Sequence, residues 1–204
     1  MRLSQLPDAL ADRFGPTSSA FPDRHRKNAA VALVLRPPPG VTDPRVDRCE
    51  VLAIRRADSS RDPWSGQMAL PGGSLDAADP GLMAAAVREA REETGLRLDV
   101  DGHPLGRIEP MRPLGVRLPV ITIWPFVFQS DPAAHARIAS PEVASVHWFQ
   151  VRALADRSNR SSYAYRDPAL GERKFPCIRL DGQVIWGLTY RILTQFLEVL
   201  RSPV

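Results

Sequence analysis

Apolar residues along this chain come mostly in short continuous runs that prolines or charged residues end, and such runs are typical of buried strands. The clearest run is AAVALVLRP at 29–37, which three consecutive prolines end. The same pattern predicts further strands at 50–56, about 105–111, 119–128, 143–151, 175–180 and 183–186. Asp181-Gly182 separates the last two runs, and this dipeptide favours a tight hairpin turn.

Other segments have apolar residues spaced three or four apart, which is typical of amphipathic helices. This spacing predicts a short helix over 3–14, one or two helical turns at 151–156, and a last helix at about 187–201. The polar segment 157–173 predicts a loop.

The clearest helix is predicted over residues 81–94. Asp79 is the expected N-cap, and Pro80 is expected at the first helical position, where its missing N–H does no harm. Gly95 follows the last helical residue and predicts the C-terminal end.

The predicted strands outnumber the helices, and the helices are widely separated along the chain. This order favours an α+β fold, with a mixed β-sheet sandwiched between helices, over a doubly wound parallel sheet. The 204 residues suffice for one domain with modest extensions. We therefore expect an N-terminal helix and loop extension at 1–27 and a main domain at 28–204.

Composition excludes several classes of protein. Charged residues interrupt every apolar run before the roughly 18 residues that a bilayer-spanning helix needs, so no membrane association is expected. The start of the chain lacks the apolar core of a secretory signal, and two cysteines are too few for a disulfide scaffold, so the default location is cytoplasmic. The formal net charge is +4, but the basic residues are scattered, which predicts a solvated surface and no nucleic-acid partner. A basic rim that attracts a polyanionic small molecule is the alternative.

Three glutamates lie near the end of the clearest predicted helix. Glu93 is four residues after Glu89 and Glu92 is three residues after it, so the three carboxylates project from one side. Like charges at this spacing cost roughly a few tenths of a kcal/mol per pair, and the helix macrodipole also disfavours anions there. A hard divalent cation such as Mg²⁺ would offset this cost and bridge to substrate phosphates. The alternative is a solvated acidic helix end paired with Arg88 and Arg91.

The pair Gly72-Gly73 precedes this helix and favours the metal site over the solvated acidic helix end. Glycines allow a tight turn and a close approach of the backbone to other groups. A glycine turn that leads into a helix with clustered glutamates is typical of a metal-phosphate site.

The same segment resembles the Nudix box, whose pattern is Gly, five residues, Glu, seven residues, then Arg-Glu-apolar-x-Glu-Glu-x-Gly-apolar. Gly73 matches the first glycine, and residues 88–96, REAREETGL, match the second half in order. Asp79 fills the first acidic position, with one extra residue between it and the second half. This variant resembles the coenzyme A pyrophosphatase branch, whose GGxxDxxD pattern is supplied by Gly72, Gly73, Asp76 and Asp79.

Two further stretches resemble the same branch. Residues 56–73 resemble its coenzyme A-associated signature, although four residues instead of three separate Arg61 from Gly66. Residues 185–189, IWGLT, resemble the start of the last helix of that branch.

The resemblance implies a Nudix fold and a hydrolase that cuts a nucleoside diphosphate linked to another group, with Mg²⁺ or Mn²⁺ as cofactor. It implies Glu89 and Glu93 as principal metal ligands, with Glu92 completing the metal shell or positioning the attacking water. Arg88 would hold a glutamate in place, and the backbone of Gly73 would support the site.

Further residues are candidates for substrate binding. Arg56 and Arg61 are expected to grip phosphates beside Gly72, with solvated surface charge as the alternative for the two arginines. Trp64 lies in a polar loop and could stack on an adenine or shield the site. Some Nudix enzymes place a further acidic base in a late loop, but for Glu142, after a Ser-Pro turn, structural hydrogen bonding is favoured.

The expected substrate is therefore a small-molecule nucleoside diphosphate conjugate similar to coenzyme A. ADP-ribose, a dinucleoside polyphosphate or an oxidised nucleoside triphosphate remains an alternative, because the spacing after Arg61 is altered. A Nudix-fold binding module without turnover is a third reading, although such modules usually lack one of the helix glutamates. The oligomeric state stays open, with a homodimer as one option.

Overall fold

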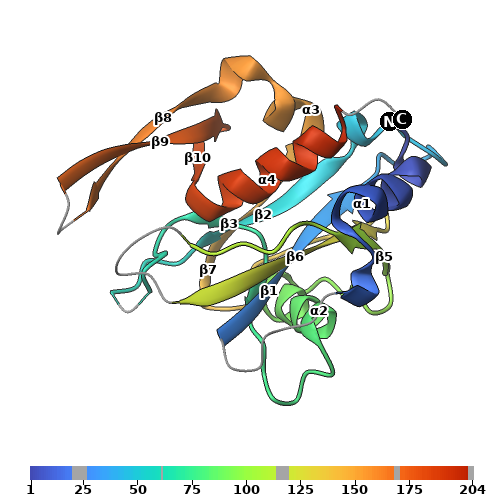
Figure 1. Cartoon of the computed structure of the whole chain (residues 1–204), viewed down its shortest axis with the longest axis horizontal. Helices are drawn as coiled ribbons and strands as arrows, with labels where there is room; N and C mark the ends of the chain where they lie inside the picture. The colour runs from blue at the N-terminus through green and yellow to red at the C-terminus, as the bar shows by residue number, and fades with distance from the viewer. Residues whose placement is uncertain (20–26, 61, 114–119, 168–170, 202–204) are drawn as a thin grey trace.

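The computed structural model describes residues 1–19, 27–60, 62–113, 120–167 and 171–201, and these form a mixed sheet with helices on both faces (Figure 1). The strands are β1 Lys27–Arg36, β2 Glu50–Arg56, β3 Met68–Ala69, β4 Gly72–Ser74, β5 Gly102–Arg107, β6 Ile121–Ser130, β7 Val143–Gln150, β8 Arg160–Asp167, β9 Gly171–Leu180 and β10 Gln183–Trp186. The helices are α1 Leu6–Phe14, α2 Leu82–Thr94, α3 Val151–Ala155 and α4 Gly187–Val199. Within the described residues the main sheet has the order β3-β2-β1-β6-β5, with β4 added to β1 and β7 to β2. The predicted α+β fold is confirmed.

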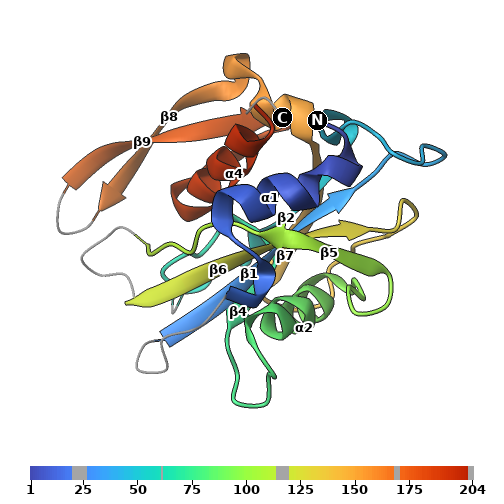
Figure 2. The ribbon, with the colours of Figure 1, turned by 45° about the vertical axis from the view of Figure 1, so that its right-hand side comes forward.

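Strand β1 lies at the centre of the sheet and divides the core into two layers. It runs parallel to β6 and antiparallel to β2 and β4. Ala30, Ala32 and Val34 belong to the apolar cluster that contains the inner face of α2. The alternate residues Leu33 and Leu35 belong to the cluster that contains α1 and α4. The period-two alternation of β1 therefore places α2 on one face of the sheet and α1 and α4 on the other (Figure 2).

Helix α2 agrees closely with its prediction, but its start differs. The helix begins at Leu82 with Gly81 as the N-cap, so the predictions of Asp79 as N-cap and of Pro80 at the first helical position are both wrong. The physical reason is that both Asp79 carboxylate oxygens accept hydrogen bonds from the Arg88 guanidinium, at 3.0 Å each. Gly95 ends the helix in the left-handed conformation, with φ 72°, as predicted.

A second, three-stranded sheet projects from the body of the protein, in the order β10-β9-β8 (Figure 1). The prediction of a loop over 157–173 is wrong, because β8 and the start of β9 lie there. Tyr163 pairs with Phe175 across the two strands, and the rings of Tyr163 and Tyr165 lie 4.8 and 5.1 Å from that of Trp186. Cross-strand aromatic contacts thus support a strand whose other residues are mostly polar.

The last hairpin has the turn that the sequence predicts. Asp181 and Gly182, with φ 51° and 75°, connect β9 to β10. Glycine readily adopts positive φ values, and an aspartate tolerates them better than most other residues. Strand β10 then leads directly into α4, which begins at Gly187.

The N-terminal helix α1 is packed into the core. Leu6 and Leu10 are completely buried, and the Gly106 backbone of β5 lies close against the Leu10 side chain. Arg13 also forms an ion pair of 2.8 Å with Glu198 of α4. The boundary between an extension at 1–27 and a domain at 28–204 stays a prediction. Among the described helices none has the length and apolar character needed to cross a membrane.

Candidate active site

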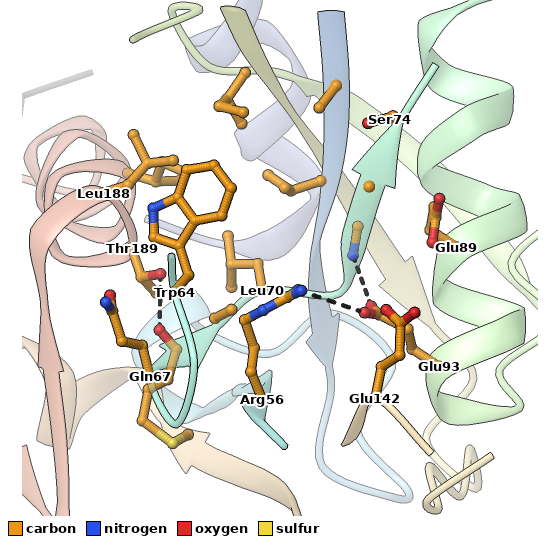
Figure 3. Close-up of a pocket in the computed structure, with 18 of the residues that line it drawn as sticks. Arg56, Trp64, Gln67, Leu70, Ser74, Glu89, Glu93, Glu142, Leu188 and Thr189 are labelled. Carbon is orange, nitrogen blue, oxygen red and sulfur yellow. Dashed lines mark hydrogen bonds and ion pairs between the residues drawn. The ribbon is translucent and has the colours of Figure 1, made fainter. Parts of the chain in front are cut away.

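A cavity of about 370 Å³ lies between the ends of β1 and β6, the strands β3 and β4, helix α2 and the first turn of α4 (Figure 3). Three carboxylates line one end of it, from Glu89, Glu93 and Glu142, and Arg56 lies beside them. The opposite end, with Trp64 and Leu188, is mostly apolar. The topology therefore gives the cavity one anionic end and one hydrophobic end.

Glu93 is the most buried of these acids, with 4% of its surface exposed. The backbone N–H of Gly72 donates a hydrogen bond of 2.8 Å to its Oε2, and Arg56 Nη1 lies 4.0 Å from its Oε1. Burial raises the pKa of Glu93 to about 7, and the neighbouring Glu89 and Glu142 charges add to the rise. The Gly72 N–H thus fixes one oxygen of Glu93, and the predicted role of Gly72 in substrate binding stays a prediction.

Glu89 packs directly against Gly73, which lies in strand β4 and pairs with Ala30 of β1, so the prediction of a tight turn at Gly72-Gly73 is wrong. A Cβ atom at Gly73 would lie only 2.3 Å from Glu89 Oε1, so the carboxylate occupies the space that any other residue would fill. Arg88 Nη1 donates a hydrogen bond of 2.9 Å to the same oxygen. Burial raises the pKa of Glu89, and the Arg88 charge opposes the rise. Gly73 and Arg88 therefore orient this glutamate together.

Arg88 connects helix α2 to the segment that joins it to β4. Its guanidinium donates to both oxygens of Asp79, to Glu89, to Glu92 and to the backbone carbonyl of Ser74. The Asp79 side chain is only 6% exposed, and the Arg88 hydrogen bonds hold the pKa of that carboxyl below its ordinary value. Asp79 thus anchors Arg88, which in turn positions Glu89.

We expect Asp79→Asn to lower the free energy of unfolding by about 1–3 kcal/mol at neutral pH, because it breaks a nearly buried, charge-assisted pair. The lowered pKa of Asp79 means that this stabilisation is present above the ordinary carboxyl pKa of about 4 and is lost as pH falls through the lowered value. Urea denaturation at neutral and acid pH measures both effects. Asp99→Asn, at an exposed aspartate after α2, is the control. If the difference in unfolding free energy between wild type and Asp79→Asn did not become smaller at acid pH, the Asp79–Arg88 pair would not be its cause.

The structure places Glu92 differently from the other two helix glutamates. Its side chain is 57% exposed, it is not among the residues that line the cavity, and Arg88 Nη1 lies 3.2 Å from its Oε2. Its role as a metal ligand or water-positioning group stays a prediction.

Of the two candidate phosphate-binding arginines, the structure brings Arg56 to the cavity wall. Its Nε donates a hydrogen bond of 2.6 Å to Asp62. Arg61 lies outside the described residues. Arg56 is thus the arginine of this pair whose position the structure supports.

Glu142 is a cavity residue that the sequence argument undervalued. Its backbone does make the expected structural hydrogen bonds, since its N–H donates to Ser140 and its carbonyl accepts from Ala57. Its side chain, however, lies beside Glu93 in the cavity (Figure 3). Its place after a Ser-Pro turn and before a predicted strand carries no distinctive spacing, so the sequence could not single it out.

The other end of the cavity has a mainly apolar wall, in which Gln67 and Thr189 are polar members (Figure 3). Its apolar part is a cluster with Ala29, Val31, Ile121, Ile123, Trp64 and Leu188 as members. Trp64 lies next to Leu188 (Figure 3), so its predicted position at the site has support. The wall presents aliphatic and aromatic carbon directly beside the carboxylate end.

The donor set suits a hard divalent cation, although the site is not preformed. Within the described parts of the chain, no three His, Cys, Asp or Glu side chains have the arrangement of a ready-made metal site. Glu89, Glu93 and Glu142 nevertheless lie close enough that their charges raise the pKa values of Glu89 and Glu93. Mg²⁺ prefers carboxylate oxygens, so these residues fit the ion, and its binding would compete with Arg88 for Glu89.

Comparison with known proteins gives a consistent result. A model of the NUDIX domain family matches residues 27–167, more than half of the chain. A Photorhabdus laumondii protein called "Uncharacterized Nudix hydrolase NudL" is 28% identical over 201 residues, which cover 96% of each chain. An uncharacterised protein of Schizosaccharomyces pombe is 28% identical over 155 residues, or 71% of this chain, and the match spans 47% of that longer relative.

Among solved structures, a MutT/nudix family protein from Enterococcus faecalis has a TM-score of 0.54 and 17% identity, covering 91% of this chain and 66% of its own. This likeness shows the shared fold.

Proposed function

This chain belongs to the Nudix family, and we propose that it is a Mg²⁺- or Mn²⁺-dependent hydrolase that cleaves the diphosphate of coenzyme A or a related nucleoside diphosphate conjugate. The observation that carries this proposal is the division of the cavity into a carboxylate end and an apolar end. A metal-diphosphate complex suits the first end, and an uncharged organic arm suits the second.

The residues of the carboxylate end have complementary roles in the proposed reaction. Glu89 and Glu93 would hold the metal ion, which supplies charge neutralisation and acidifies a water molecule when bound. Arg56 binds a phosphate oxygen with its guanidinium, since arginine presents a planar fork to phosphate. Glu142 is placed to accept a proton from water, because its carboxylate faces the same space as Glu93. Phosphoryl transfer depends mainly on such positioning and charge neutralisation.

The apolar wall supports a coenzyme A-like arm over a second sugar. Hydroxyl or ring nitrogen groups that entered this wall would lose water without gaining hydrogen bonds from Ile121, Ile123 or Leu188. A pantetheine arm also carries two amides and a hydroxyl, for which Gln67 in the lining offers a hydrogen-bond partner, and its dimethyl and methylene groups suit the aliphatic side chains. The geometry thus favours coenzyme A among the diphosphate conjugates.

We expect Mg²⁺ affinity to rise with pH. In the metal-free protein the pKa of Glu93 is raised to about 7, so near neutrality part of the population holds a proton there. A metal ligand must be deprotonated, so binding should strengthen from about pH 6 to 8 and release a fraction of a proton. Titration calorimetry in two buffers of different ionisation enthalpy measures that fraction. The pH dependence should become smaller in Glu93→Gln, where Glu89 is the remaining helix ligand with a raised pKa. A wild-type affinity that stays flat over this range would refute the role of Glu93.

The function itself is tested by incubating the purified protein and Mg²⁺ with coenzyme A. The expected products are 3′,5′-ADP and 4′-phosphopantetheine. A parallel panel of ADP-ribose, a dinucleoside polyphosphate and oxidised nucleoside triphosphates gives the order of kcat/KM. A higher value for any of these would move the assignment to that substrate, and no cleavage of any member would overturn the proposal.

A further inference from the structure

We propose that Asp62 is a positioning residue, whose single carboxylate holds the Arg56 guanidinium and the Trp64 segment in place at the two ends of the cavity. This inference rests on the proposed function, because it concerns how the cavity binds the phosphates and the arm of one substrate. Asp62 is not among the residues that line the cavity. It would act through the two residues that do.

The contact with Arg56 determines which part of the guanidinium faces the cavity. Asp62 Oδ2 accepts a hydrogen bond of 2.6 Å from Arg56 Nε, and the two side chains are only 17% and 22% exposed. Arg56 Nη1 lies 4.0 Å from Glu93 Oε1, on the cavity side (Figure 3). Because Asp62 takes the inner nitrogen, the terminal nitrogens are directed toward the place where a phosphate would lie.

The second carboxylate oxygen serves the loop that carries Trp64. Asp62 Oδ1 accepts a hydrogen bond of 2.9 Å from the Trp64 backbone N–H. The Ser65 N–H donates to the Asp62 carbonyl at 3.1 Å, which closes a turn with Pro63 at its second position. Aspartate at the first and proline at the second position are both favoured in such turns. The carboxylate thus sets the backbone from which the indole reaches Leu188.

Loss of the Asp62 charge has a specific consequence for the cavity. Among the described residues, Glu93 is the other carboxylate within ion-pair distance of Arg56. Without Asp62, the guanidinium would move toward Glu93 and neutralise a metal ligand, instead of facing a phosphate. Substrate binding should therefore weaken although no cavity-lining residue has changed.

The test compares the binding of two ligands in the presence of Mg²⁺, ADP without an arm and coenzyme A with one. Asp62→Asn keeps an oxygen for the Trp64 N–H but removes the charge that holds Arg56. We expect it to weaken both ligands about tenfold and to raise KM for coenzyme A by a similar factor. Asp62→Ala also removes the Trp64 contact, so it should weaken coenzyme A about threefold further and leave ADP at the Asp62→Asn value.

A double-mutant cycle separates this role from a merely structural one. In an Arg56→Ala background, Asp62→Asn should change ADP affinity less than about twofold, because its effect runs through the missing arginine. Asp58→Asn is the matched control, since Asp58 lies in the same loop, is 82% exposed and pairs with Arg55 at 3.7 Å. It should leave both affinities unchanged.

If Asp62→Asn lowered ADP affinity equally in the wild-type and Arg56→Ala backgrounds, the proposal would be overturned. Unchanged ADP affinity in Asp62→Asn would overturn it as well. Wild-type protein that binds neither ligand would overturn it too. The proposed function fails separately, if the wild-type protein binds these ligands but cleaves no diphosphate in the panel. In that case the ADP measurements still decide the role of Asp62.

Discussion

Replacing Glu93 by glutamine should lower kcat by about 10³-fold or more while the protein stays folded. Glutamine keeps the size of the side chain and an oxygen that can accept from the Gly72 N–H. It removes the charge that would bind the metal ion. Because burial raises the pKa of Glu93, a neutral residue there is no less compatible with the core, so the melting temperature should be unchanged or higher. Steady-state hydrolysis of coenzyme A and a thermal melt measure the two quantities.

Two further glutamates calibrate this result. Glu109→Gln changes a 58% exposed residue whose nearest described ion partner, Arg107, is 3.9 Å away, and it should leave kcat within about twofold of wild type. Glu92→Gln tests the predicted role of the exposed helix glutamate, and a smaller loss than at Glu93 is expected from its exposure. If Glu93→Gln kept its activity, Glu93 would not be a metal ligand that the reaction needs. If it lost activity and its melting temperature also fell, unfolding would explain the loss.

The second large effect is expected for Gly73→Ala, which should lower kcat/KM by about 10²-fold, because a displacement of roughly 1 Å at a catalytic group has consequences of that size. The added Cβ would lie 2.3 Å from Oε1 and 2.5 Å from Cδ of Glu89. The end of a glutamate side chain is flexible, so the fold can absorb the methyl group by moving the carboxylate. The displaced carboxylate then loses its place beside Arg88 and the cavity. Stability should change little, and activity should change greatly.

The matched control is Gly81→Ala. Gly81 caps the same helix, but a Cβ there meets no atom within 4 Å, and its φ of 171° is an extended value that alanine adopts readily. Activity close to wild type is expected. If both alanine variants lost activity equally, a change in α2 and not the Glu89 contact would be responsible. A crystal structure of Gly73→Ala with Glu89 unmoved would also contradict the argument.

The helix glutamates show how far spacing alone could predict the site. Successive residues turn by about 100° around a helix, so Glu93 is rotated about 40° from Glu89 in one direction and Glu92 about 60° in the other. The spacing therefore predicted that Glu89 and Glu93 lie on the same side, but not that Glu92 would stay at the surface, outside the cavity. Glu142 was beyond such reasoning, because it reaches the cavity through the pairing of β7 with β2.

Two of the errors in the predicted fold, the N-cap and the loop over 157–173, have the same origin. Asp79 satisfies the local rules for an N-cap, but a bidentate contact with Arg88, nine residues away, outweighs capping. Strand β8 is mostly polar, and its strand character appears only when Tyr163 meets Phe175 of β9. Strand β1, in contrast, is apolar on both faces and ends at consecutive prolines, so its own sequence predicted it well. Where the local sequence pattern does not determine the structure, as at Asp79 and in β8, contacts between segments distant in the sequence determine it.

The packing of α1 and α4 has a practical consequence for recombinant work. A fragment trimmed to the segment that the family model matches, 27–167, would carry neither helix. Leu33 and Leu35 would then be exposed to solvent, and exposed apolar surface of this kind promotes aggregation. The trimmed piece would also lack Leu188, and with it part of the wall beside Trp64. Cloning boundaries for assays or crystals should therefore include both flanking helices, even though the recognisable motif lies well inside them.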